Sequence, residues 1–158
     1  MRGVALSFNG GKDCMVLLHL FLKTVIDVYG AERASRIAVP AIYIRDEEPF
    51  PEMESFIETC RERCRLHLMT LPAPMKASLS CYCAQHTEVK AILMGTRKTD
   101  PYSDKLHPFH PCDVSSGWPD VTRVLPILPW QYDHVWAFLR EEKHLSQPLG
   151  WCALYDRG

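Results

Sequence analysis

The feature of this sequence that most limits its fold is a glycine-containing segment at residues 7–14, which reads Ser-Phe-Asn-Gly-Gly-Lys-Asp-Cys. It follows a short apolar run at residues 4–6 and precedes a long apolar stretch at residues 15–28, a pattern that predicts a strand, a tight turn and a helix. Two adjacent glycines allow the backbone to turn sharply and bring its N–H groups close to a ligand. The helix start adds unpaired N–H groups and a partial positive charge, and Lys12 adds a full charge. The segment therefore predicts an anion site, and phosphate fits it best.

This segment is not a Walker loop, which requires a glycine, four further residues and then Gly-Lys-Ser/Thr. Leu6 stands where the first glycine should be, and Asp13 stands where the hydroxyl residue should be. The segment instead resembles the Ser-Gly-Gly-Lys-Asp-Ser loop of the PP-loop family, whose members cleave ATP between the α- and β-phosphates. Here Asn9 precedes the glycines and Cys14 replaces the final serine. The alternative is a plain turn with an exposed Lys–Asp pair, but turn, charge and helix start coincide, which favours a phosphate loop.

Strand and helix patterns alternate through the first 95 residues. Further strands are predicted at residues 37–44, 65–71 and 91–95, and a second helix is predicted from Pro51, a residue suited to a first helical position. Pro40 is a mild objection to the second strand because proline lacks a donor for the ladder. The alternation predicts an α/β fold with a mostly parallel sheet and helices on both faces.

The second half of the chain breaks this alternation. Residues 96–121 contain no convincing periodic element, and a loop of this length inside a compact domain is usually functional. We expect an ordered binding loop there. A short extended run is predicted at residues 123–128, and a last amphipathic helix is predicted around residues 132–139.

Composition places the chain among ordinary globular proteins. Its 158 residues suggest one domain, and its 47% hydrophobic and 23% charged residues are typical of that class. The net charge of −1 favours neither nucleic acid nor a membrane surface as a partner. No apolar run is long enough to span a bilayer, and the phosphate loop begins too early for a signal peptide. Seven scattered cysteines predict reduced thiols in the cytoplasm or the mitochondrial matrix.

The cysteines do not form a metal-site pattern. Cys60 and Cys64 lie on the apolar face of the second helix and are expected in the core, because no second ligand pair follows at zinc spacing. Cys81 and Cys83 are too close for a paired-cysteine motif and are expected to be structural. A metal cluster could be imagined in the long loop, but the spacing does not favour it; its members would be His107, His110, Cys112 and Asp113.

Several segments taken together resemble one family along nearly the whole chain. They are residues 7–13, 43–52, 95–101, 117–120, 123–128 and 154–158. In this order they are similar to the eukaryotic FAD synthases, FMN adenylyltransferases with a fold like that of PAPS reductase. The resemblance implies an adenine nucleotide alpha hydrolase-like fold. It also implies a reaction of ATP with FMN that gives FAD and pyrophosphate, with Mg²⁺ as cofactor.

The resemblance also implies roles for individual residues. Those expected to bind ATP are Ser7, Phe8, Asn9, Gly10, Gly11, Lys12, Asp13, Ile44, Arg45 and Gly95. Those expected on the flavin side are Arg97, Asp100, Asp113, Trp118, Asp120 and Arg123. Catalysis is expected from Asn9, Lys12, Asp13 and Arg97, with Asp13 as the metal ligand. Trp118 would stack on the flavin ring, and the alternative is a tryptophan of the core.

Three rival functions remain. A PAPS reductase requires a redox cysteine near its C-terminus, and Cys152 does not lie in that enzyme's Glu-Cys-Gly motif. A tRNA-thiolating enzyme would need paired Cys-x-x-Cys motifs and a basic surface. The third is a non-catalytic flavin- or nucleotide-binding module.

The family continues past the segment matching residues 154–158, so we expect a single domain that is trimmed at its C-terminus and has reduced activity.

Overall fold

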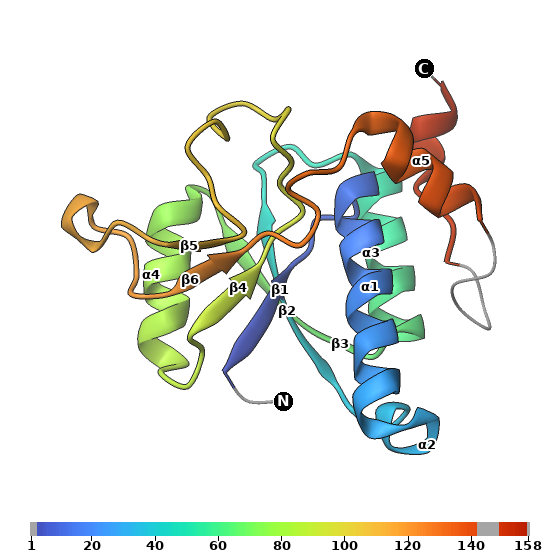
Figure 1. Cartoon of the computed structure of the whole chain (residues 1–158), viewed down its shortest axis with the longest axis horizontal. Coiled ribbons are helices and arrows are strands. Elements are labelled where there is room, and N and C mark those ends of the chain that lie inside the picture. Colours follow the sequence, from blue (N-terminus) through green and yellow to red (C-terminus); the bar gives the residue numbers. More distant parts are fainter. Residues whose placement is uncertain (1–2, 142–148, 158) are drawn as a thin grey trace.

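The computed structural model describes residues 3–141 and 149–157, and its centre is a six-stranded sheet (Figure 1). The strand order is β3-β2-β1-β4-β6-β5, and β5 alone runs antiparallel to its neighbour. The strands are β1 Val4–Ser7, β2 Val39–Arg45, β3 Leu66–Pro72, β4 Ala91–Leu93, β5 Phe109–Pro111 and β6 Thr122–Val124. The helices are α1 Lys12–Tyr29, α2 Ala31–Ala34, α3 Pro51–Arg63, α4 Met75–Gln85 and α5 Tyr132–Arg140. Two 3₁₀ turns are η1 Val114–Ser116 and η2 Ala153–Arg157.

Helices cover both faces of the sheet, as predicted. Leu6 and Ala41 are paired neighbours that pack into a first core cluster with α1 and α3. Ala5 and Ile42 point to the opposite face and pack into a second cluster with α4. Figure 1 shows α1 and α3 on one side of the strands and α4 on the other. The alternation follows from the two-residue period of a strand and confirms the α/β fold with a mostly parallel sheet.

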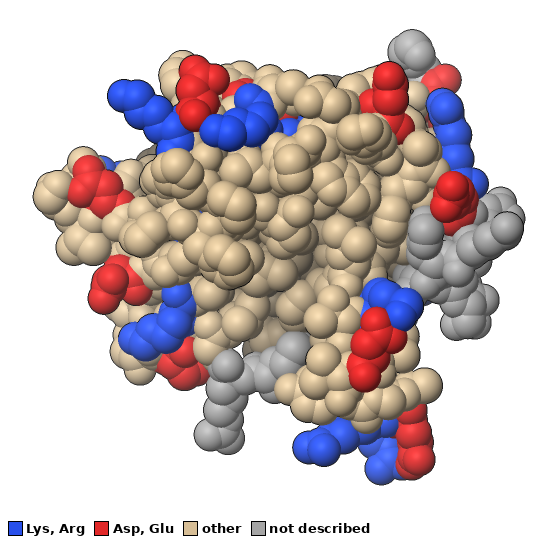
Figure 2. Space-filling model, in the orientation of Figure 1, with Lys and Arg blue, Asp and Glu red and all other residues tan. Residues whose placement is uncertain are grey.

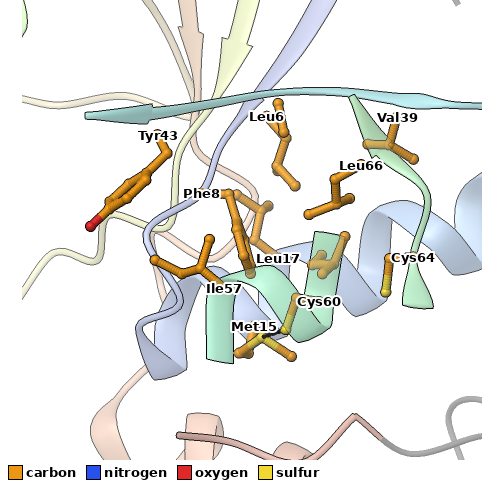
Figure 3. Packing of buried hydrophobic residues seen from close by; sticks show 12 residues of the cluster. Leu6, Phe8, Met15, Leu17, Val39, Tyr43, Ile57, Cys60, Cys64 and Leu66 are labelled. Atoms are coloured by element: carbon orange, nitrogen blue, oxygen red, sulfur yellow. Dashed lines mark hydrogen bonds between the residues drawn. The ribbon is translucent and has the colours of Figure 1, made fainter. Parts of the chain in front are cut away.

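The first core cluster joins the phosphate loop to α3 (Figure 3). Phe8 is fully buried in it, beside Ile57 of α3. Cys60 and Cys64 are buried in the same cluster, which confirms that they belong to the core. The Cys60 sulfur lies 3.8 Å from the Met15 sulfur, and burial raises the pKa of the Cys60 thiol to about 12. These two cysteines therefore act as apolar side chains.

Helix α1 is buried mainly along its first half, and Val25 is the buried residue of its second half. Its buried residues include Met15 to Leu18, whereas Ile26 and Val28 near its far end are 36% and 65% exposed. The apolar side chains of its last turns are therefore partly open to solvent. Gly30 ends the helix, with a positive φ of 77° and an N–H that donates to the Ile26 carbonyl at 2.8 Å.

Both prolines that bear on the element predictions are accommodated. Pro40 lies within β2, where the paired register with β1 begins only at Ala41, so its missing donor falls at the start of that ladder. Pro51 occupies the first turn of α3, followed by Glu52 and Glu54 at the positive end of the helix.

Two predictions for the second half are wrong. Residues 96–121 do contain regular structure, because residues 109–111 form β5 against β6 and residues 114–116 form η1. The predicted extended run at 123–128 is a strand only as far as Val124. Beyond it, the Leu128 N–H donates to the Leu125 carbonyl at 3.2 Å, so this apolar stretch is a buried turn. None of the helices in the described residues is both long and apolar enough to span a membrane.

Candidate functional site

The phosphate loop lies where the strand order reverses. β1 is flanked by β2 on one side and β4 on the other, so the residues after β1 and after β4 emerge side by side at the carboxyl edge of the sheet. Ligands of open α/β sheets bind at such a switch point. Ser7 ends β1 and Gly95 follows β4, which brings two of the segments predicted to bind ATP together.

Packing against α3 requires a glycine in the middle of the loop. Gly10 has a φ of 72°, and a Cβ there would lie 2.7 Å from the Met53 sulfur and 2.8 Å from Cγ1 of Ile57. Asn9 shapes the same turn, because its Oδ1 accepts a hydrogen bond of 3.0 Å from the Gly11 N–H. Gly11 then stands at the N-cap of α1 with no side-chain cap. The loop thus presents the start of α1, whose N–H groups favour anions.

Gly95 brings the segment after β4 directly against the start of α1. A Cβ at this position would lie 3.0 Å from the Asp13 carbonyl carbon and 3.1 Å from the Cys14 nitrogen. Backbone atoms cannot turn aside as a side chain can, so a larger residue here would push the two segments apart by a few tenths of an ångström. The following residues are therefore held beside the phosphate loop.

Four charged side chains gather where these segments meet. Lys12 Nζ lies 2.9 Å from Asp13 Oδ2, and Arg97 Nε lies 3.0 Å from Asp13 Oδ1. Arg97 also contacts Asp100, with Nη2 2.9 Å from Oδ1 and its backbone N–H donating to Oδ2 at 2.7 Å. Arg97 is only 8% exposed. The group holds two cations and two carboxylates, so phosphates arriving here would find two cations already in place.

Two tyrosines that the sequence interpretation missed complete the surroundings of Lys12. Its Nζ lies 5.7 Å from the ring centroids of both Tyr132 and Tyr155. The Tyr155 hydroxyl also accepts a hydrogen bond of 3.3 Å from the Lys12 backbone N–H. Tyr155 lies within the family-like segment 154–158, but no local pattern could indicate a contact with a residue 143 positions earlier.

Cys14 is the residue that replaces the final serine of the family loop. It is partly buried at the start of α1. Burial is the main cause that raises the pKa of its thiol to about 11, while hydrogen bonds to the backbone at Asn9 and Gly95 oppose the shift. The thiol therefore stays protonated at neutral pH and is not a candidate nucleophile.

The carboxyl end of β2 is held by a glutamate of α3. Glu54 accepts a hydrogen bond of 2.5 Å from the Tyr43 hydroxyl and lies 3.0 Å from Arg45 Nε. Burial, followed by the hydrogen bond to Glu54, raises the pKa of Tyr43 to about 12. Ile44 packs against the second core cluster, and Arg45 is exposed. The sequence interpretation did not single out Glu54.

The candidate flavin residues around η1 form a turn of their own. The Asp113 carboxylate accepts hydrogen bonds from the Ser115 hydroxyl at 2.6 Å and the Ser116 hydroxyl at 2.5 Å, which lower its pKa. Lys76 of α4 donates to the Ser116 carbonyl and lies 5.9 Å from the Trp118 ring centroid. The turn is thus anchored to itself and to the start of α4.

Three further flavin candidates follow that turn in the chain. Trp118 is partly buried against the second core cluster, and Asp120 is exposed. Arg123 lies on β6 in register with Ile92 and His110, so its side chain lies on the face covered by α4. Partial burial and the nearby Arg123 charge lower the pKa of His110. Of the six flavin candidates, Arg97 is the one that pairs with the phosphate loop among the described residues, through Asp13, and Asp100 pairs in turn with Arg97.

No group of three or more His, Cys, Asp or Glu side chains in residues 3–141 and 149–157 is arranged to hold a metal ion. His107 and His110 stack on each other with ring centroids 6.1 Å apart. Magnesium does not need such a cage, because one or two carboxylates together with substrate phosphates usually hold it. Asp13 supplies such a carboxylate at the phosphate loop.

The chain matches a family model along nearly its whole length. This model, described as the phosphoadenosine phosphosulfate reductase domain, matches residues 3–80 and 73–158. The chain is 35% identical over 156 residues to a probable FAD synthase of Schizosaccharomyces pombe, an alignment covering 98% of this chain and 56% of the relative. It is 38% identical over 159 residues to a probable FAD synthase of Caenorhabditis elegans, covering 100% of this chain and 28% of the relative.

A solved structure of Candida glabrata FMN adenylyltransferase with FMN and the ATP analogue AMPCPP is also similar. The TM-score is 0.84 at 32% identity, covering 96% of this chain and 50% of that chain. The chain thus spans about half the length of the two fungal proteins. The predicted resemblance and the adenine nucleotide alpha hydrolase-like fold are confirmed. The chain belongs to the phosphoadenosine phosphosulfate reductase domain family and is homologous to the eukaryotic FAD synthases.

Proposed function

We propose that this chain is a single FMN adenylyltransferase domain that transfers AMP from ATP to FMN and releases pyrophosphate. The observation that carries the proposal is the phosphate loop at the switch point, with Lys12 and Arg97 already gathered beside Asp13. The related Candida glabrata enzyme binds FMN with an ATP analogue in one crystal structure and FAD with pyrophosphate in another. The same pair of ligands would suit the site of this chain.

In this reaction an oxygen of the FMN phosphate attacks the α-phosphorus of ATP. A new P–O bond forms, the bond between the α-phosphorus and its bridging oxygen to the β-phosphorus breaks, and pyrophosphate carries away the electron pair. A phosphate monoester is already an anionic nucleophile, so no enzyme nucleophile is required. The chain has to align two anions and offset their charge. The start of α1, Lys12 and Arg97 would do this, with Asn9 shaping the loop.

Magnesium fits the residues at the loop. Asp13 would hold the ion together with phosphate oxygens, the ligand combination that Mg²⁺ prefers. Each Asp13 oxygen lies beside a cation, Lys12 at one and Arg97 at the other. A bound ion would neutralise phosphate charge. Lys12 could then turn from the carboxylate to the nucleotide, because its four-carbon stem is flexible.

The two substrates would lie at different parts of the carboxyl edge. The adenine would lie at the end of β2, near Ile44 and Arg45, with the phosphates over residues 7–13 and Gly95. The flavin would extend from Arg97 and Asp100 toward the face that holds Trp118, Asp120 and Arg123. Arg123 supports this, because its Nε is buried without a hydrogen-bond partner among the described residues. Asp113 would support the flavin side as the cap of η1.

The surface charge of the chain bears on its partners, and its cysteines bear on its cellular compartment. Figure 2 shows positive and negative side chains interspersed around the rim of one face, around an uncharged centre. This face favours neither nucleic acid nor an anionic membrane. All seven cysteines are free thiols, which favours the cytoplasm or the mitochondrial matrix.

The test is to incubate the chain with ATP, Mg²⁺ and FMN and to separate the flavins by chromatography. We expect FAD and an equal amount of pyrophosphate. Arg97→Gln, which leaves Asp13 and Asp100 without their shared cation, should lose most FAD formation, whereas Arg33→Gln on exposed α2 should retain it. Saturable FMN binding without FAD would instead indicate a non-catalytic module. If the chain neither forms FAD nor binds FMN, the flavin assignment is refuted.

A further inference from the structure

Lys12 is enclosed by aromatic rings from the far end of the chain. Tyr132 comes from the first turn of α5 and Tyr155 from η2, and each ring centroid lies 5.7 Å from Lys12 Nζ. A lysine ammonium within about 6 Å of an aromatic centroid is attracted to the ring face. We propose that Tyr155, assisted by Tyr132, is a positioning residue that holds Lys12 in place for the phosphates of ATP. This inference rests on the proposed function and assigns a role to the C-terminal segment of the chain.

Tyr155 is itself held by a network of aromatic side chains. Its ring meets Trp136 edge-on at 5.8 Å, and Trp136 meets Trp151 at 5.4 Å. The Trp151 indole N–H donates to Asp156 at 2.9 Å. The Tyr155 N–H donates to the carbonyl of Cys152, a residue that is only 1% exposed. Edge-to-face pairs have defined geometry, so this network fixes the ring rather than merely covering it.

The tyrosine acts on two parts of the same lysine. Its ring faces the ammonium, while its hydroxyl accepts from the Lys12 backbone N–H at 3.3 Å. It also limits the space at the N-cap, because a Cβ on Gly11 would lie 3.4 Å from the hydroxyl oxygen. The Tyr132 and Tyr155 rings attract the ammonium through their faces and carry no formal charge, so the ammonium can exchange Asp13 for a ligand while both ring contacts remain.

The groups that face Lys12 suggest which kinetic constant should change. Asp13 attracts the Lys12 ammonium by its charge, whereas the two tyrosines restrict where the ammonium can lie. Loss of a ring leaves the charges in place but allows the long lysine side chain more rotamers, which weakens its contact with ATP. The effect should therefore fall on ATP rather than on FMN.

The experiment compares Tyr155→Leu with Tyr155→Phe. Removing the ring should raise KM for ATP about 3- to 20-fold, the range expected for a partly desolvated cation–π contact, and change KM for FMN less than about twofold. Tyr155→Phe keeps the ring and should retain a KM for ATP within about threefold of the parent. The matched control is Tyr29→Leu, which removes a ring facing Arg33 at 5.4 Å, away from the site. It should leave both constants unchanged.

Equilibrium binding separates this inference from the proposed function. AMPCPP is titrated into the parent chain and each variant by calorimetry. If the parent binds no AMPCPP, the proposed function fails. If the parent binds it and Tyr155→Leu binds equally well, or if Tyr155→Phe loses as much affinity as Tyr155→Leu, the positioning role is overturned. Should Tyr155→Leu not fold, Tyr132→Leu removes the other ring from a residue that is 58% exposed and carries the same expectation for ATP.

Discussion

The phosphate loop and the turn around η1 share two structural features, but the aspartates in them have different partners. Each has a glycine with a left-handed backbone, Gly10 with φ 72° and Gly117 with φ 77°, and each has an aspartate at the start of a helix. The Asp113 carboxylate is satisfied by hydroxyls two and three residues away. Asp13 meets Arg97, which comes from a segment far along the chain.

This difference separates a structural acid from a binding acid. Hydrogen bonds within one turn must stay made if the turn is to persist, so Asp113 has little freedom to contact a ligand. Ion pairs between distant segments can be exchanged for bonds to a phosphate or a metal ion while both segments remain in place. Asp13 therefore has the arrangement expected of a site residue, and Asp113 has that of a cap.

The largest expected effect comes from exchanging each acid for its amide. Asp13→Asn should lower kcat/KM for FAD formation about 100- to 1,000-fold, the loss seen when one preorganised electrostatic group is removed from an active site. Asp113→Asn should stay within about threefold, because asparagine also caps helices. Steady-state kinetics measure both. A large loss for Asp113→Asn would show that the turn contacts a substrate directly.

A smaller effect is expected from placing alanine at each left-handed glycine. Gly10→Ala combines backbone strain with overlap against Met53 and Ile57 of α3, and should cost about 2–5 kcal/mol in the free energy of unfolding. At Gly117 the nearest atom is Lys76 Cε at 3.4 Å, an ordinary contact, so Gly117→Ala should cost only the strain of about 1–2 kcal/mol. Urea unfolding measures both values. Equal costs would mean that α3 moves aside from the loop.

The smallest effect is a pH dependence confined to the η1 turn. The Ser115 and Ser116 hydrogen bonds lower the pKa of Asp113 below its ordinary 3.8, so folding favours its carboxylate form. The stability that Asp113 contributes is present above about pH 4 and is lost as the pH falls through its folded pKa. The difference in urea midpoint between the parent and Asp113→Asn should therefore shrink below pH 3.8. A difference that persists at lower pH would contradict this.

The sequence predicted those parts of the fold that local signals determine. The glycine loop, α1 and the alternating strands were predictable because period and glycine punctuation act over a few residues. β5 was not, because Phe109–Pro111 is a strand only through its pairing with β6. Residues 125–128 were misread because an apolar run indicates burial without distinguishing a strand from a turn.

The candidate site likewise contains one part that local sequence signals predict and other parts that arise only when the chain folds. Residues 7–13 could be predicted as a phosphate loop because they form one continuous segment. That Gly95 and Arg97 belong near this loop was implied only by family resemblance. Their contacts with the start of α1 and with Asp13 were not predicted, since the chain must fold before these segments meet. The contact between Lys12 and Tyr155 had no signal at all, and neither did the support that Glu54 gives to Tyr43 and Arg45.

Cys14, at the end of the phosphate loop, provides a thiol whose chemical labelling can report on ligand binding. Because the pKa of Cys14 is about 11, very little of it is thiolate at neutral pH while the loop is closed against Gly95. Exposed Cys81 on α4 should take up an alkylating reagent first. The rate at which Cys14 is labelled afterwards then measures how accessible the start of α1 is to the reagent. We expect a nucleotide bound over residues 7–13 to cover this thiol and slow its labelling, so mass spectrometry of one thiol could follow ligand binding without any fluorophore.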